Sequence, residues 1–113
     1  MRVRTMPNRS KVKIAIIQGI DRKIDLEELA GGKGMELSDL LTEIEAIVDS
    51  GTRLNLDYYI DDILDTEHQD ELMDWFAEAQ EDDLEAAIEE FGGDFTEDEI
   101  RLMRIKFISE MGN

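Results

Sequence analysis

The sequence has 113 residues, a formal net charge of −17, no cysteine and a single histidine. Its length suits one folded domain, and the missing cysteine excludes a disulfide framework, thiolate chemistry and a zinc site built from His and Cys. No apolar run reaches the roughly 18 residues of a membrane-spanning helix, and no signal peptide is visible, so a cytoplasmic protein is expected.

The charge is divided unevenly along the chain. Residues 1–23, the basic head, contain seven basic residues and one acidic residue, whereas residues 57–99, the acidic block, contain nineteen acidic residues and no basic one. The head could approach a polyanion such as DNA, and the acidic block would be repelled by one.

The first elements are a linker and a helix. Residues 1–9 contain the only proline and no apolar period, so we expect a linker or basic arm there. A helix is expected from about residue 10 to residue 20 with Ser10 as its N-cap, although alternating apolar residues at its start also fit a strand.

Residues 25–51 have the pattern of a helix-turn-helix. Asp25 is expected to cap a short helix over 26–30, and GGKG at 31–34 forms the turn before a longer amphipathic helix that ends at Gly51. Two helices that cross steeply need a small residue at the contact, here Ala30, and a glycine that tolerates positive φ, here Gly34. A purely structural helix hairpin has the same pattern.

The longer helix of this pair is unusual for a DNA-reading element because it carries no Lys or Arg. With its apolar stripe toward the core, none of its outward residues can donate bidentately to guanine or neutralise a phosphate. Those outward residues are Glu36, Asp39, Thr42, Glu43, Ala46 and Ser50.

The remaining sequence predicts an all-α fold. After a short extended stretch at 52–56, Asp57 is expected to cap a helix over 58–64, and further helices are expected at 66–79 and 83–91. Thr96 begins a capping box before the last helix. The predicted organisation is an arm at 1–9, a helix-turn-helix at 10–64, and an acidic helical extension at 65–113 packed on it.

Two runs carry a resemblance to a known family. The helix-turn-helix found at the C-terminal end of RecQ-family ATP-dependent DNA helicases is similar to KVKIAIIQGIDRKIDLEELAGGKGMELSDLLTEIEAIVDSGTRLNLDYYIDD. The extreme C-terminus of one bacterial branch of that family resembles EEFGGDFTEDEIRLMRIKFISEMGN. The resemblance covers residues 10–113 and implies an accessory part of a longer helicase that acts in DNA unwinding, recombination and repair.

The motor residues of that family are missing from this sequence. It contains no Gly-x-x-x-x-Gly-Lys-Thr/Ser phosphate loop, and GGKG does not follow a strand. We therefore expect a chain that is not itself an enzyme and binds no cofactor, with ATP and Mg²⁺ held by the motor domains of the longer protein. The three carboxylates at 61, 62 and 65 are interpreted as a solvated acidic face rather than a metal site.

Two kinds of partner follow from the charge pattern. Weak DNA contacts are expected from the basic head and from the turn of the helix-turn-helix. The residues concerned are Arg2, Arg4, Arg9, Lys11, Lys13 and Lys33. The alternative for the head is an interdomain linker whose charge is incidental. The acidic block would contact other domains of the helicase or a basic protein surface. The alternative function is a protein-interaction or autoregulatory module with no direct DNA contact.

Trp75 and Phe76 are the remaining candidates for a nucleic-acid contact, because aromatic rings can stack on bases. Acidic neighbours at 74 and 78 oppose that use. Both rings are therefore assigned to the core.

Overall fold

The computed structural model describes residues 9–79 and 84–111, and every regular element in these ranges is a helix, which confirms the predicted all-α class. No helix in these two ranges is long and apolar enough to span a membrane. The helices are α1 (Arg9–Asp21), α2 (Leu26–Gly32), α3 (Leu37–Asp49), α4 (Asp57–Ile63), α5 (Thr66–Ala79), α6 (Leu84–Phe91) and α7 (Glu97–Met111).

The predicted turn chemistry of the helix-turn-helix is present. Asp25 caps α2, because its Oδ2 accepts hydrogen bonds from the amides of Glu27 at 3.0 Å and Glu28 at 3.2 Å. Gly34 has φ +72° between α2 and α3, and Gly51 has φ +102° just after α3. Left-handed backbone at these two points lets the chain leave each helix abruptly.

Three predicted helix ends were wrong. α1 begins at Arg9, so Ser10 lies inside the helix rather than at its cap. α2 continues to Gly32, because the carbonyls of its last turn still accept hydrogen bonds from the amides of Lys33 and Gly34. α4 begins at Asp57 itself, whose amide donates to Oδ1 of Asn55 at 2.9 Å.

The carboxylate of Asp57 has a different use from the predicted cap. Its Oδ1 lies 2.8 Å from Nζ of Lys106 on α7. An ammonium group attracts a carboxylate more strongly than an amide does, so Asp57 joins two helices instead of capping its own.

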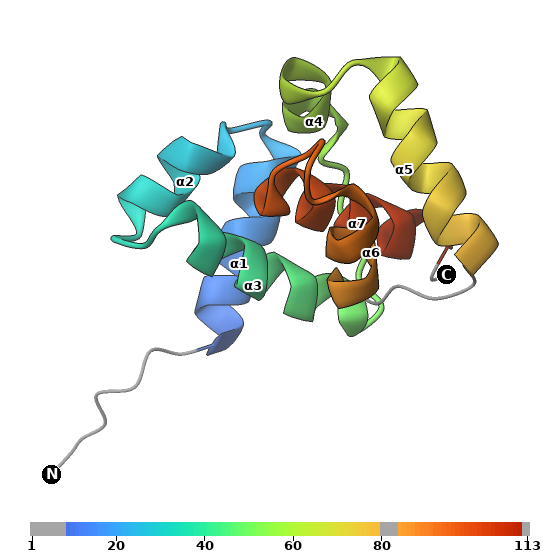
Figure 1. Cartoon of the computed structure of the whole chain (residues 1–113). Helices are drawn as coiled ribbons and strands as arrows, with labels where there is room; N and C mark the ends of the chain where they lie inside the picture. The colour runs from blue at the N-terminus through green and yellow to red at the C-terminus, as the bar shows by residue number, and fades with distance from the viewer. Residues whose placement is uncertain (1–8, 80–83, 112–113) are drawn as a thin grey trace, which may run out of the picture.

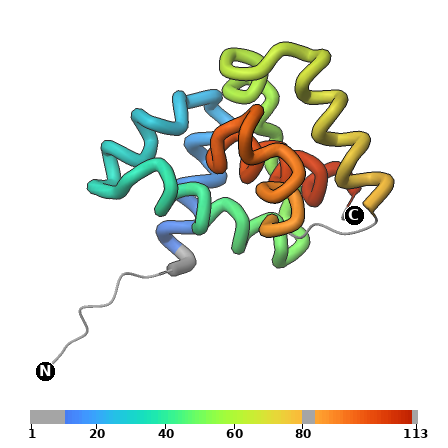
Figure 2. Tube along the Cα trace, viewed as in Figure 1, coloured from blue at the N-terminus to red at the C-terminus, as the bar shows by residue number. Residues whose placement is uncertain are grey.

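Helix α7 lies in the middle of the molecule, with α1 to α3 on one side and α4 and α5 on the other (Figures 1 and 2). It contacts α3, α4, α5 and α6. Apolar side chains on several of its faces are almost completely buried: Ile100, Leu102, Met103 and Ile105. A helix that is apolar on most sides must be enclosed by others, and this is the place that α7 takes.

The start of α7 is fixed by the capping box that the sequence predicts. The amide of Thr96 donates to Oε1 of Glu99 at 2.9 Å, and the amide of Glu99 donates to Oγ1 of Thr96 at 3.1 Å. These reciprocal bonds satisfy two amides at the first turn of the central helix.

The aromatic pair on α5 belongs to the core, as predicted. Phe76 is fully buried and its ring stacks on that of Phe107, with centroids 5.6 Å apart. Trp75 is half-buried and meets Phe91 edge to face at 5.9 Å. Neither ring is arranged as a platform for nucleic-acid bases.

All the helices contribute to one hydrophobic core, from Ile16 on α1 to Ile105 on α7. The contacts of α3 with α7 join the helix-turn-helix to the residues that follow it. The predicted division at residues 64 and 65 stays a prediction.

We predict that Gly34→Val lowers the free energy of unfolding by about 1–3 kcal/mol, because a β-branched residue is strongly disfavoured at positive φ. Space is not the reason, since a Cβ at Gly34 would meet nothing within 4 Å. Chemical denaturation measures the loss. The matched control is Gly31→Ala, which also enters open space but lies within α2 and should not destabilise. An unchanged stability of Gly34→Val would contradict this account.

Candidate nucleic-acid interface

Helix α3 takes the place of the recognition helix in a helix-turn-helix, following α2 and the Gly34 turn (Figure 1). Its apolar stripe is buried as predicted, with Leu40, Leu41 and Ile44 fully enclosed. Of the six predicted outward residues, five are exposed and Glu43 is half-buried. The solvent-facing surface of α3 therefore presents carboxylates and small side chains, with no Lys or Arg.

Negative charge at the start of α3 has a local structural role. The amide of Glu36 donates to Oδ2 of Asp39 at 3.4 Å, across the first turn. Carboxylates near a helix N-terminus are stabilised by the positive end of the helix dipole. The same carboxylates would repel the phosphates of DNA that approached along this end of α3.

One flank of α3 is covered by α7 through Arg101. The Nε and Nη2 atoms of Arg101 donate to the two carboxylate oxygens of Glu45 at 3.0 and 2.9 Å, and Nη2 also reaches Oγ1 of Thr42 at 3.0 Å. Arg101 is only 7% exposed. The hydrogen bond to Glu45 raises the pKa of Arg101 above its ordinary value, outweighing the opposing effect of burial.

Lys106 on α7 is likewise engaged inside the molecule. Its Nζ lies 2.8 Å from Asp57 and 3.8 Å from Glu110. Burial alone would lower the pKa of Lys106, but the hydrogen bond and charge of Asp57 raise it. The positive charges of Arg101 and Lys106 thus neutralise acidic residues of this chain and do not form a basic surface.

The predicted DNA contacts do not gather at the turn of the helix-turn-helix. Lys11 and Lys13 are exposed on α1, whereas Lys33 is half-buried between α2 and α3. In Figure 1 the first half of α1 extends away from the α2–α3 turn. Arg2 and Arg4 lie outside the described residues, and the side chain of Arg9 is not described. DNA contact by these residues stays a prediction.

Two further basic residues lie at the other end of α1. Arg22 and Lys23 are exposed just after the helix, and Lys23 has φ +60°. Both residues belong to the basic head, but they are not among the DNA contacts expected from the sequence. Their place directly after a helix is the only sequence pattern that marks them, and the same pattern is produced by basic residues that interact with the helix dipole.

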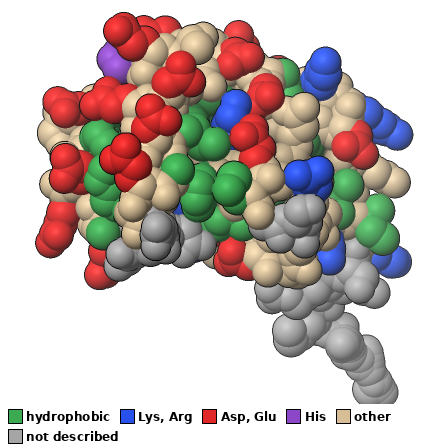
Figure 3. Space-filling view, turned by 90° about the vertical axis from the view of Figure 1, so that its right-hand side faces the viewer, with side chains coloured by type: hydrophobic (Ala, Val, Ile, Leu, Met, Phe, Trp, Pro, Cys, Tyr) green, Lys and Arg blue, Asp and Glu red, His purple; other side chains and the backbone are tan. Residues whose placement is uncertain are grey.

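Acidic side chains dominate one side of the surface in Figure 3, and Lys and Arg side chains gather on the other. The described residues contain no group of three or more His, Cys, Asp or Glu side chains placed to hold a metal ion. The carboxylates of the acidic block are thus dispersed over the described surface rather than converging on one point.

Tyr58 fastens α4 to the start of the helix-turn-helix. Its hydroxyl donates to the carbonyl of Ile24, in the turn between α1 and α2. Burial, followed by the negative charge of Asp25, raises the pKa of Tyr58 from 10.0 to about 12. The phenol is therefore held in its protonated form as a donor.

A comparison with protein families matches residues 10–60 to the RecQ-1-like helix-turn-helix domain. The match begins within α1 and ends within α4, so it covers the three helices of the helix-turn-helix and the connection that follows. No curated protein matches the chain.

We predict that Glu45→Leu destabilises the protein by about 3–5 kcal/mol, because it leaves the buried guanidinium of Arg101 without its carboxylate. Arg101→Met should cost less, since Glu45 retains some contact with water at 17% side-chain exposure. The double variant should recover most of the loss, because two apolar side chains then replace the ion pair. Urea denaturation of all four proteins measures this cycle, and simple additivity of the two single losses would contradict the pairing.

A second prediction concerns alkaline pH. Because the pKa of Tyr58 is about 12 in the folded protein and 10.0 ordinarily, its contribution to stability is complete below pH 10 and is lost as the pH rises toward 12. In the Tyr58→Phe variant, stability should fall less steeply over this interval than in the wild type. Absorbance of tyrosinate in native and denatured protein checks the pKa directly, and equal midpoints would show that Tyr58 is not perturbed.

Proposed function

We propose that the chain is a non-catalytic accessory domain of a RecQ-type ATP-dependent DNA helicase, because its residues 10–60 match the RecQ-1-like helix-turn-helix domain. In this role it assists or regulates the engagement of DNA during unwinding, recombination and repair in the cytoplasm. ATP and Mg²⁺ would be bound by motor domains of the longer protein, whose phosphate-loop motif this sequence lacks.

The charge of α3 is the observation that carries the proposed mode of DNA contact. Its exposed positions supply carboxylates and no guanidinium or ammonium group, so α3 would be repelled from the major groove. We infer that DNA is approached through the basic head instead. Lys11 and Lys13 are its exposed described residues on α1, and they suit contact with phosphates rather than reading of bases.

A second function is supported by the acidic block. Residues 57–99 contain no Lys or Arg, and their described part covers α4, α5 and α6 with exposed carboxylates. Such a surface favours a basic protein surface or another domain of the helicase. The chain would then be a protein-interaction or autoregulatory module with no DNA contact of its own.

The first function is tested by measuring how the whole chain binds fluorescent forked and duplex DNA. Fluorescence anisotropy reports the binding at about 50 and 200 mM salt. The variant Lys11→Gln/Lys13→Gln should weaken binding and reduce the slope of log K against log salt by about 1–2. Its matched control, Arg22→Gln/Lys23→Gln, removes the same charge at the other end of α1 and should retain most of the affinity.

The role of α3 is tested in the same assay by Asp39→Asn/Glu43→Gln, which keeps the polar side chains and removes two negative charges. Its affinity should equal or exceed that of the wild type, because a repulsive contribution is lost. If this variant loses affinity while the head variant keeps it, α3 is the DNA-reading element and the proposed mode is wrong. If the wild type binds neither forked nor duplex DNA at the lower salt concentration, the first function is wrong and the protein-interaction function is the one retained.

A further inference from the structure

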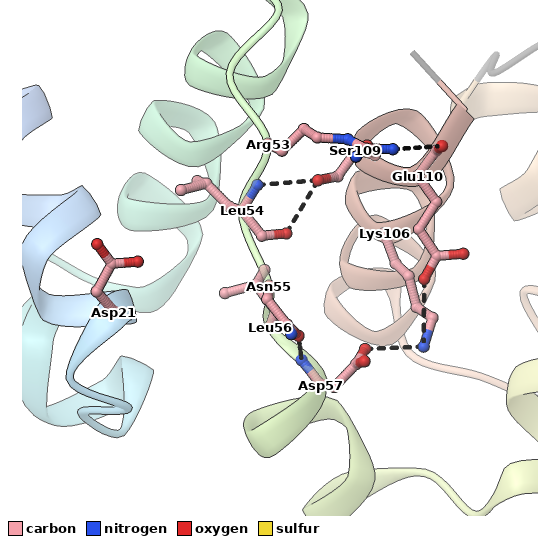
Figure 4. Close-up of a pocket in the computed structure, with 9 residues that line it drawn as sticks. All are labelled: Asp21, Arg53, Leu54, Asn55, Leu56, Asp57, Lys106, Ser109 and Glu110. Atoms are coloured by element: carbon pink, nitrogen blue, oxygen red, sulfur yellow. Dashed lines mark hydrogen bonds and ion pairs between the residues drawn. The ribbon is translucent and has the colours of Figure 1, made fainter. Parts of the chain in front are cut away.

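The connection between α3 and α4 presents one hydrogen-bonded edge and one free edge. The amide of Leu54 donates to Oγ of Ser109 at 2.9 Å, and the same hydroxyl donates to the carbonyl of Leu54 at 3.0 Å. The amide and carbonyl of a residue point to the same side only where the backbone is extended. Leu54 therefore lies in an extended stretch of backbone, and α7 takes up the edge to which its amide and carbonyl point (Figure 4).

The opposite edge belongs to Arg53 and Asn55, because successive residues of a strand point their backbone groups to opposite sides. Within the described part of the chain, the amides and carbonyls of these two residues make no hydrogen bond to another backbone group. Their side chains are exposed, whereas Leu54 and Leu56 are buried. Unpaired backbone groups in a row form a template for pairing with another extended chain.

This free edge borders an open cleft. One cavity of about 370 Å³ lies between the connection, Asp21 at the end of α1, and the last turns of α7. A second cavity of about 430 Å³ shares Asp21, Asn55 and Asp57 with the first. In Figure 4 Asp21 lies on the side of the connection away from α7. Each of the two cavities is of the size of a small ligand-binding pocket.

The residues that line the two cavities include four acidic and three basic side chains, so the cleft has an excess of one negative charge. Lys106 is paired with Asp57, and Arg53 donates to the carbonyls of Ser109 and Glu110 at 3.1 and 3.2 Å. These two cations are therefore already engaged with other groups of the chain.

Two carboxylates of the wall, Asp21 and Asp61, form no ion pair within the described ranges. Asp21 has no partner among the described residues, and Asp61 accepts a hydrogen bond from the neutral amide of Gln69 at 2.9 Å. The lining of the second cavity contains one basic residue, Lys23. A ligand that adds a positive side chain would improve the charge balance of this wall.

We propose that the cleft binds an extended, basic peptide segment of a partner protein. The segment adds a strand to the free edge at Arg53 and Asn55, and it directs a Lys or Arg side chain toward the carboxylates of Asp21 and Asp61. Backbone pairing supplies the affinity and the carboxylates supply the selection for positive charge. This site is separate from the basic residues of α1 that would contact DNA, so it can exist whether or not the chain binds DNA.

The probe is a synthetic pentapeptide of alternating valine and arginine, acetylated and amidated at its ends. Titration into the ¹⁵N-labelled chain should shift the amide signals of Arg53 and Asn55 more than those of α5 and α6. The matched peptide with glutamate in place of arginine should not bind. Shifts spread over the acidic surface of α5 and α6 would overturn the proposal, because they indicate non-specific attraction between charges.

Strand addition has a further signature in the peptide backbone. Only alternate amides of a strand pair with one edge, so N-methylation of one alternate set should weaken binding about tenfold or more, and methylation of the other set should be tolerated. Equal affinity of the two methylated peptides would overturn the proposal. This comparison needs no change to the protein, so it decides the question even if a variant fails to fold.

The protein side is tested by Asn55→Pro and Asn55→Ala. Both variants lose the side-chain bond to the amide of Asp57, but only proline also removes the backbone amide at the free edge. Asn55→Pro should lose binding and Asn55→Ala should keep it. Asp21→Asn/Asp61→Asn should bind the arginine peptide about threefold to tenfold more weakly. Its control is Asp70→Asn/Asp74→Asn on α5, which removes the same charge away from the cleft and should bind as the wild type.

Discussion

The packing of α7 against α3 is the contact on which the rest of the structure depends. α7 closes the core of the helix-turn-helix with apolar residues on several faces, and at the same interface it buries the guanidinium of Arg101. A buried positive charge requires a paired carboxylate, and Glu45 of α3 supplies both of its oxygens. The position of α3 is thereby fixed from the side that the earlier helices do not cover.

This arrangement gives negative charge on α3 two different roles. Glu45 is needed inside the interface, and Asp39 bonds an amide at the start of the helix. Neither role requires nucleic acid, and both place a carboxylate on a helix that contains no Lys or Arg. The domain thus retains the geometry of a helix-turn-helix while its exposed charge favours contact with cations or basic surfaces.

The connection after α3 depends on the same helix. Ser109 and Arg53 tie residues 53–54 to the last turns of α7, and Lys106 holds Asp57 at the start of α4. These bonds hold the connection against α7, and the cleft beside α1 borders the same residues.

The sequence by itself determined the elements whose causes are local. Apolar spacing, the Asp25 cap, the Thr96 capping box and the glycines at 34 and 51 each act within a few residues, so the helices and their order could be predicted. Only the tertiary structure decided the central position of α7 and the pairing of Arg101 with Glu45. It also decided that Asp57 binds Lys106 rather than capping α4, and that one edge of residues 53–55 stays free of backbone bonds. These outcomes join residues about fifty positions apart, and no spacing rule specifies which of many carboxylates will face a given cation once the helices pack.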